Sequence, residues 1–168
     1  IILCTLTLIL SIGCKQNIEI KETKTTAINP LSYTTVAFKS LKDTALVATF
    51  SGRISERING KENENEVINL NDEIYSLAYN KSNATIYAAT LNTGIVVIDE
   101  NNKSIVKTIP NDDLWITNLY LVNNNKWLIG VSARRKNYVW DIANNYTAVD
   151  LPEQFSKSKI ADVSATGT

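Results

Sequence analysis

The side chains with the most potential for chemistry lie in two polar segments beyond the middle of the chain. The first segment holds Asp112, Asp113 and Trp115, and the second holds the adjacent pair Arg134 and Arg135. Aromatic and Arg side chains dominate the energetics of many binding interfaces, and carboxylates pair readily with guanidinium groups. These five residues are therefore the candidate binding site. The alternative is that the polar residues form solvated turns and that Trp115 packs inside the fold.

Composition removes several kinds of catalytic site. The 168 residues include no His, which excludes Ser-His and Cys-His nucleophile pairs, the commonest general base and most zinc sites. The 17 Lys and Arg residues balance 17 Asp and Glu residues, so the chain as a whole lacks the basic excess that binds nucleic acid. We therefore assign no catalytic residue and no cofactor, and we expect no nucleic-acid partner.

Oxygen ligands for Ca²⁺ are the one metal-binding possibility. Two acidic pairs, Asp72 with Glu73 and Asp112 with Asp113, could supply such ligands. Neither pair lies in the spacing of an EF-hand loop or in a repeated Gly-Asp pattern, so we predict no metal site.

Cys14 is the second position with specific chemistry, because a thiolate is a nucleophile that can accept a lipid chain. Residues 1–13 carry no charge and are largely apolar, too short for a membrane-spanning helix but typical of the apolar part of a secretory signal. The run from residue 10 to Cys14, Leu-Ser-Ile-Gly-Cys, resembles the lipobox of bacterial lipoproteins. The alternative is a buried apolar strand with an incidental Cys.

The lipobox resemblance implies where the protein resides. In that family the signal peptide, here residues 1–13, is cut before the Cys, which carries fatty acids on its sulfur and on its new amino group. More than one acyl chain gives stable membrane anchoring. Lys15 follows Cys14 where an Asp would resemble an inner-membrane retention signal, so the resemblance favours the outer membrane. Residues 14–32 are polar and suit a tether, of which 24–28 could instead form a closing strand.

The rest of the chain repeats with a period near 42 residues. Val36, Leu77, Leu119 and Val163 occupy the same place in four alternating apolar segments, with separations of 41 (77−36), 42 (119−77) and 44 (163−119). The first three segments are each followed by a polar turn and three more strand-like segments, the last of which spans residues 146–151 in the third unit. Four strands per unit and a repeat of about 42 residues are typical of the blades of a β-propeller. A β-sandwich also has short, evenly spaced strands, but it does not require the register to return every 42 residues.

Positions within the units keep the same register. Thr49, Thr90 and Ser132 end the second predicted strands at separations of 41 (90−49) and 42 (132−90). Asp99 and Asp141 end two of the third strands, again 42 apart (141−99). The repeat therefore extends to single residues at the turns.

One of these segments carries a family resemblance. Residues 138–141, Tyr-Val-Trp-Asp, resemble the third strand of a WD-repeat blade, and residues 94–99 are a degenerate version with Ile98 in place of Trp. The resemblance covers about residues 33–168 and implies a propeller fold. The family's buried network needs a His, which this chain lacks, so we expect Asp99 and Asp141 to be turn residues. Residues 93–99 are also similar to repeats of quinoprotein and lactonase propellers.

These observations predict an all-β fold, a β-propeller fragment with three four-stranded antiparallel blades and the start of a fourth. The first residue is Ile rather than Met, and the repeat stops within a unit. We therefore expect a longer natural chain, with at least about 120 further residues. The predicted blades span about residues 33–70, 74–110, 115–152 and, incomplete, 159–168.

A propeller would gather the candidate binding residues on one face, where outer-to-inner connections and second-to-third strand turns meet. That face would hold residues 71–73, 91–93, 111–115 and 133–136. Lys136 stands where Gly52 and Gly94 stand in the other units, so we expect a different turn there. Residues 61–66 are expected to form a solvated loop between the third and fourth strands.

The predicted function is a lipid-anchored envelope protein whose propeller is a non-catalytic scaffold. Its partners would be the membrane, through Cys14, and a protein or small ligand on the loop face. Two alternatives remain open: the N-terminal part of a propeller enzyme of the lactonase or quinoprotein kind, and the N-terminal part of a larger sensor.

Overall fold

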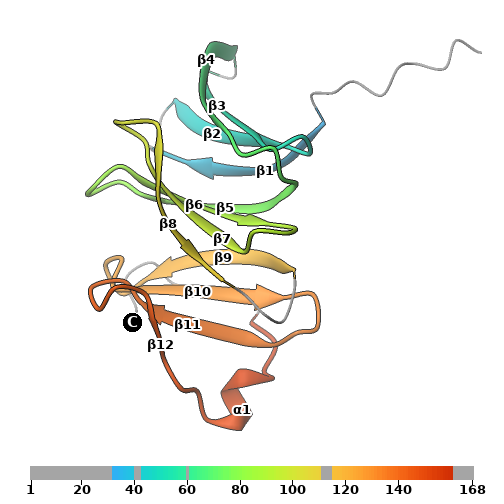
Figure 1. The fold of residues 1–168 in the computed structure, drawn as a ribbon, viewed down its shortest axis with the longest axis vertical. Coiled ribbons are helices and arrows are strands. Elements are labelled where there is room, and N and C mark those ends of the chain that lie inside the picture. Colours follow the sequence, from blue (N-terminus) through green and yellow to red (C-terminus); the bar gives the residue numbers. More distant parts are fainter. Residues whose placement is uncertain (1–31, 40–42, 60, 111–114, 161–168) are drawn as a thin grey trace, which may run out of the picture.

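Three four-stranded antiparallel sheets follow one another along the longest axis of the molecule (Figure 1). The computed structural model describes residues 32–39, 43–59, 61–110 and 115–160. Within these residues the regular secondary structure is almost entirely strand, with one short helix, which confirms the predicted all-β class and the four strands per unit. Several predicted features lie outside the described residues: the signal segment 1–13, Cys14, the possible closing strand 24–28, Asp112, Asp113 and residues 161–168.

Each sheet is built from consecutive strands in chain order. The first contains β1 (Tyr33–Phe38), β2 (Thr44–Thr49), β3 (Arg53–Ile58) and β4 (Lys61–Asn69). The second contains β5 (Ile74–Asn80), β6 (Thr85–Thr90), β7 (Ile95–Asp99) and β8 (Ser104–Ile109). The third contains β9 (Ile116–Val122), β10 (Trp127–Ser132), β11 (Asn137–Asp141) and β12 (Thr147–Ala148), and α1 (Glu153–Ser156) follows it.

Neighbouring sheets bury two apolar layers, one between the first and second sheets and one between the second and third. Because strand side chains alternate between faces, each central strand of the second sheet contributes to both layers. Ile86 and Ala88 of β6 point into the first layer, whereas Tyr87 and Ala89 point into the second. All four are fully buried. The near-continuous apolar run of β6 therefore reflects burial on both faces.

The two layers use the same positions of the repeat. Leu46 points from the first sheet toward the second, and Tyr87, 41 residues later (87−46), points from the second toward the third. Ile54 and Ile95 form the same kind of pair, also 41 apart (95−54). The period of the sequence is therefore the period at which one sheet packs on the next.

One predicted loop is a strand. Residues 61–66 were expected to be a solvated loop, but β4 starts at Lys61 and pairs with β3 from Ile58 onward. Asn59 has a φ of 52°, the left-handed conformation that two-residue hairpin turns require. The polar sequence is compatible with a strand because β4 is the edge strand of its sheet, and its register with β3 is irregular between Ser55 and Arg57.

The fourth strand of the third sheet is shorter than its sequence suggests. The prediction gave a strand over 146–151, but β12 contains only Thr147 and Ala148. Tyr146 has a φ of 62°, which breaks the extended conformation before the strand. Pro152 caps α1 after it and has no N–H to continue the ladder.

Asp99 and Asp141 are turn residues, as predicted. Asp99 accepts hydrogen bonds from the backbone of Asn101 and Asn102 and from the Asn102 side chain. Asp141 accepts two from the backbone of the next turn. The hydrogen bonds from Asn102 lower the pKa of Asp99. Both carboxylates therefore shape Asx turns after the third strands.

The rim at the β1–β2 and β5–β6 turns closes the two layers with polar contacts. Between the first and second sheets, the Lys39 ammonium donates to Glu56, at 2.7 Å, and to Glu100, which also accepts from the Tyr79 hydroxyl at 2.8 Å. Burial would lower the pKa of Lys39, but the hydrogen bonds to Glu100 and Glu56 outweigh it and raise the pKa. Burial and the bond to Glu100 raise the pKa of Tyr79 to about 12.

The seam between the second and third sheets is closed by neutral groups on the same rim. The Asn125 side-chain amide donates to the Asn80 side chain at 2.9 Å and to the Ser82 hydroxyl at 3.2 Å. On this rim, both pairs of neighbouring sheets are therefore joined through side chains that are far apart in the sequence.

Candidate functional site

The turns between the second and third strands of each sheet share one construction. Thr49, Thr90 and Ser132 are the last residues of β2, β6 and β10, and their side chains are buried. Each hydroxyl accepts a backbone N–H from a residue three or four positions later, those of Arg53, Thr93 and Lys136, at 3.1 to 3.2 Å. A buried hydroxyl is thus the physical reason why Thr or Ser returns at this register.

Each of these turns also contacts the segment that enters its sheet. The Phe50, Leu91 and Ala133 amides donate to the carbonyls of Ser32, Glu73 and Trp115. This places Trp115 beside the turn 133–136. We call this end of the molecule the loop face: it comprises the turns 50–52, 91–94 and 133–136 with the adjoining segments 70–73 and Trp115.

Asp72 organises the middle of the loop face. Its carboxylate accepts from the Asn92 backbone at 3.1 Å and side chain at 2.9 Å, and from the Thr93 backbone at 2.9 Å and hydroxyl at 2.7 Å. Burial alone would raise the pKa of Asp72, but the hydrogen bonds from Thr93 and Asn92 outweigh it and lower the pKa. The Asp72 carboxylate therefore stabilises the turn 91–94, and its role is structural.

Trp115 presents its side chain on the loop face, and it does not pack within the core. Its side chain is 49% exposed, and its backbone has a φ of 58°. A bulky residue in the left-handed region costs free energy that the surroundings must offset, and such strain concentrates at functional positions. Trp115 therefore belongs to neither of the two apolar layers described above.

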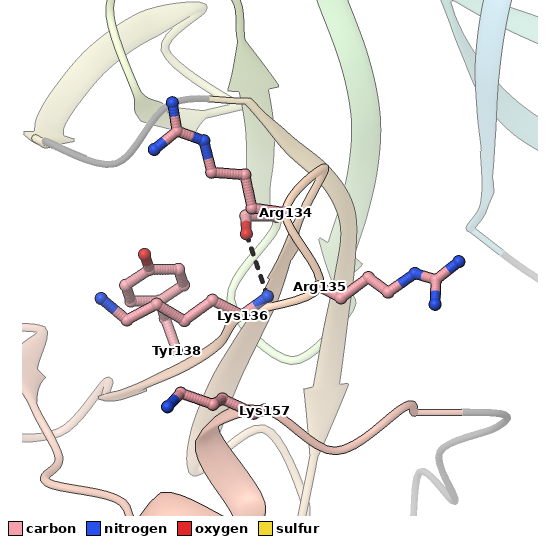
Figure 2. Close-up of a pocket in the computed structure, with 6 residues that line it drawn as sticks. Arg134, Arg135, Lys136, Tyr138 and Lys157 are labelled. Atoms are coloured by element: carbon pink, nitrogen blue, oxygen red, sulfur yellow. Dashed lines mark hydrogen bonds between the residues drawn. The ribbon is translucent and has the colours of Figure 1, made fainter.

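The turn 133–136 differs from its two equivalents, as expected from Lys136. Gly52 and Gly94 have positive φ values of 90° and 94°, whereas in the third sheet the positive φ of 60° lies at Arg135, one residue earlier. The Lys136 amide donates to the Ser132 hydroxyl at 3.1 Å (dashed in Figure 2). The turn thus keeps the shared anchor while it exposes Arg134, Arg135 and Lys136.

A pocket of about 390 Å³ opens beside this turn. We call it the cationic pocket. The structure does not bring Arg134 and Arg135 together: in Figure 2 the Arg134 guanidinium lies on the side of Tyr138 and Arg135 extends to the opposite side. Asp112 and Asp113, proposed as their partners, lie outside the described residues. The pocket is lined by Ser132, Arg134, Arg135, Lys136, Tyr138 and Lys157.

Sequence reasoning did not assign Tyr138 and Lys157 to this site. Tyr138 lies in β11, where its ring stacks on Trp140 at 5.9 Å, and the Lys136 ammonium lies 5.0 Å from its ring centroid. Lys157 reaches the pocket because the α1 segment docks on β11: the Asn137 side chain donates to the carbonyls of Phe155 and Ser158, at 2.7 and 2.8 Å. No sequence spacing signals this docking.

The described part of the chain shows no group of three or more His, Cys, Asp or Glu side chains placed to hold a metal ion. No helix within residues 32–39, 43–59, 61–110 and 115–160 is long and apolar enough to span a membrane.

Comparison with known proteins gives no assignment. The chain matches no protein-family model and no curated protein.

Proposed function

We propose that this protein is a lipid-anchored component of the bacterial cell envelope whose repeated sheets form part of a β-propeller. It acts as a non-catalytic scaffold that binds a partner protein on the loop face. The observation that carries the binding role is Trp115, a large aromatic side chain held half-exposed by a strained backbone. Aromatic side chains in such positions are enriched among interface anchors.

The propeller part of the proposal is supported by the outer face of the third sheet. Ile129 and Val139 lie 42 residues after Tyr87 (129−87) and Val97 (139−97), which pack against the next sheet. On the third sheet the equivalent positions line a pocket of about 270 Å³ together with Phe155 of α1. A further sheet of the same kind would cover this face as the third covers the second.

The membrane anchor is supported by the sequence alone, through the apolar segment 1–13 and Cys14. A tether of polar residues between Cys14 and β1 would hold the sheets away from the lipid surface.

Site-specific photo-crosslinking tests the binding role. The reactive amino acid p-benzoylphenylalanine replaces Trp115 in the full chain, expressed in its native envelope. We expect one discrete protein adduct on irradiation. The matched control places the same group at Asn101, an exposed turn position at the other end of the second sheet. The proposal fails if position 115 gives no adduct or gives the same adducts as position 101.

A further inference from the structure

Each of the three sheets ends in a strand that has a neighbour on one side only. These strands are β4, β8 and β12 (Figure 1), and within the described residues none of them pairs with another strand along its outer edge. The free N–H and C=O groups of such an edge can pair with a strand of another chain, so proteins protect edges with charges, bulges or very short strands. The protection of each edge therefore decides whether it is available to another chain.

Two of the three edges are protected. From residue 61 to 66 the sequence of β4 is Lys-Glu-Asn-Glu-Asn-Glu, without an apolar residue. β12 contains only Thr147 and Ala148, which is too short to offer a continuous edge. Neither strand is therefore suited to pairing with a further strand.

β8 offers an apolar edge. Its six residues, Ser-Ile-Val-Lys-Thr-Ile, include no Pro and no acidic residue. The side chains of Ile105 and Val106 are 53% and 59% exposed, although Ile and Val are among the residues most often buried. Both residue types also favour the extended conformation. We call these two residues the β8 apolar pair.

The Lys residues at β8 do not guard its edge. The Lys107 ammonium donates to the backbone oxygen of Asn145 at 2.9 Å and to its side-chain oxygen at 2.6 Å, and it lies 5.4 Å from the ring centroid of Tyr146. The Lys103 ammonium, just before the strand, donates to the carbonyl of Glu66 at 3.0 Å. Both cations are thus held against the neighbouring sheets, and the β8 apolar pair stays exposed.

A bulge in β8 restricts which strand can pair with it. Lys107 is in register with Val97 and Ile105 with Ile98, so Val106 is the extra residue and has no partner on β7. A bulge bends its strand and increases the local twist, so a regular strand fits poorly beside it. A second β8 carries the same bend and twist at the same residue.

We propose that β8 pairs with β8 of a second copy of this chain, antiparallel and about a two-fold axis at Val106. In this register Val106 lies opposite its counterpart, and Lys107 lies opposite Ile105 of the copy. The two Lys107 residues are therefore not directly opposite each other, an arrangement that like charges would disfavour. A two-fold contact uses the same surface of both copies and is complete in the dimer.

The pairing goes beyond the proposed function and does not depend on it. The apolar layers cover the faces of the sheets, whereas β8 offers an edge, so a further sheet packed face to face would leave it free. Trp115 lies outside β8. Photo-crosslinking at position 115 and the pairing of β8 can therefore fail separately.

Size-exclusion chromatography with light scattering, on the full chain in detergent, tests the proposal. We expect a protein mass of two chains. Val106→Lys places two ammonium groups opposite each other and should raise the Kd of the dimer about tenfold. Its matched control is Thr147→Lys, which adds the same charge at an exposed position of β12. The control should change the Kd by less than about twofold.

Disulfide cross-linking tests the register. Residues directly opposite in an antiparallel pair have Cα atoms about 4.5–5.5 Å apart, a separation that a disulfide can span. Val106→Cys should therefore form a covalent dimer on mild oxidation, beyond the background that Cys4 and Cys14 give in the wild-type chain. Thr108→Cys is the matched control: it is an exposed position of the same strand, but in this register it lies opposite Ser104 of the copy, so it should not cross-link.

The proposal is overturned if the wild-type chain is monomeric at the highest concentration that stays soluble. It is equally overturned if Val106→Lys leaves the dimer unchanged or weakens it no more than Thr147→Lys does, because the contact then lies elsewhere. Cross-linking of Thr108→Cys as efficient as that of Val106→Cys would also exclude this pairing.

Discussion

At the scale of single residues, Asp72 joins two turns that are far apart in the sequence. Its carboxylate lies before β5, while its donors Asn92 and Thr93 lie between β6 and β7. Sequence reasoning predicted that residues 71–73 and 91–93 share a face, and the hydrogen bonds confirm it. It could not predict which Asp becomes buried, because the donors come from residues twenty or more positions away.

The lowered pKa of Asp72 leads to a pH-dependent stability. Because the folded-state pKa is below the unfolded value of about 3.9, the stabilisation is fully present above that value and is lost as pH falls through the folded-state pKa. Asp72→Ala should cost about 2 kcal/mol at pH 7, by removing charged hydrogen bonds. The difference between the free energies of unfolding of variant and wild type, measured in urea from pH 7 to pH 3, should narrow as the pH falls below about 3.9.

The control for this experiment is Asp150→Ala, at an exposed position after β12. It should change the free energy of unfolding by less than about 0.5 kcal/mol. A difference between Asp72→Ala and wild type that stays constant down to pH 3 would contradict the role given to the carboxylate.

At the scale of elements, the turn between β2 and β3 is fitted tightly against the chain that leaves β4. Gly52 has a φ of 90°, and a Cβ there would lie 2.7 Å from the backbone nitrogen and oxygen of Asp72. Backbone atoms cannot give way as a flexible side chain can. The close approach of two separate loops therefore depends on the absence of a side chain at this position.

Gly52→Ala should destabilise the protein by at least about 2 kcal/mol, through both the clash and the positive φ. Thermal unfolding followed by circular dichroism measures the change. The neighbouring Ser51→Ala, at an exposed position of the same turn, should have a much smaller effect. Equal effects of the two substitutions would show that the close contact with the Asp72 backbone does not exclude a side chain at position 52.

The strands could be predicted from the sequence wherever apolar residues alternate, as in β5, β9 and β10. The exceptions have local physical causes. The polar residues of β4 give no apolar pattern, and the signal that could have located the hairpin is the Asn59-Gly60 pair, which favours a two-residue turn. β12 was predicted too long at both ends: the positive φ at Tyr146 precedes the strand, and the chain leaves it for α1, whose N-cap is Pro152.

At the scale of the whole molecule, the sheets are related by the repeat that the sequence displays. Among the described residues, one apolar layer joins the first sheet to the second and another joins the second sheet to the third. The sequence predicted this series because equivalent core positions recur every 41 or 42 residues. It could not predict the cationic pocket in full, because the pocket depends on how α1 docks on β11.

The proposed anchor is a property of the whole molecule, and Cys14→Ala tests it. Labelling with radioactive palmitate should be lost in the variant, and the protein should move from the membrane fraction to the soluble fraction. Cys4→Ala is the matched control, since Cys4 lies within the proposed signal segment, and it should leave labelling unchanged. Undiminished labelling of Cys14→Ala would refute the lipoprotein assignment.

The buried hydroxyl beneath each turn has a consequence for how this protein can evolve. The buried Ser132 hydroxyl holds the backbone of the turn. The shape of the turn therefore does not depend on the exposed side chains of Arg134 and Lys136. Substitutions at these positions can change the charge that the turn presents while the backbone that carries it stays the same. Selection can thus act on recognition and on folding through separate residues, even where those residues are neighbours in the chain.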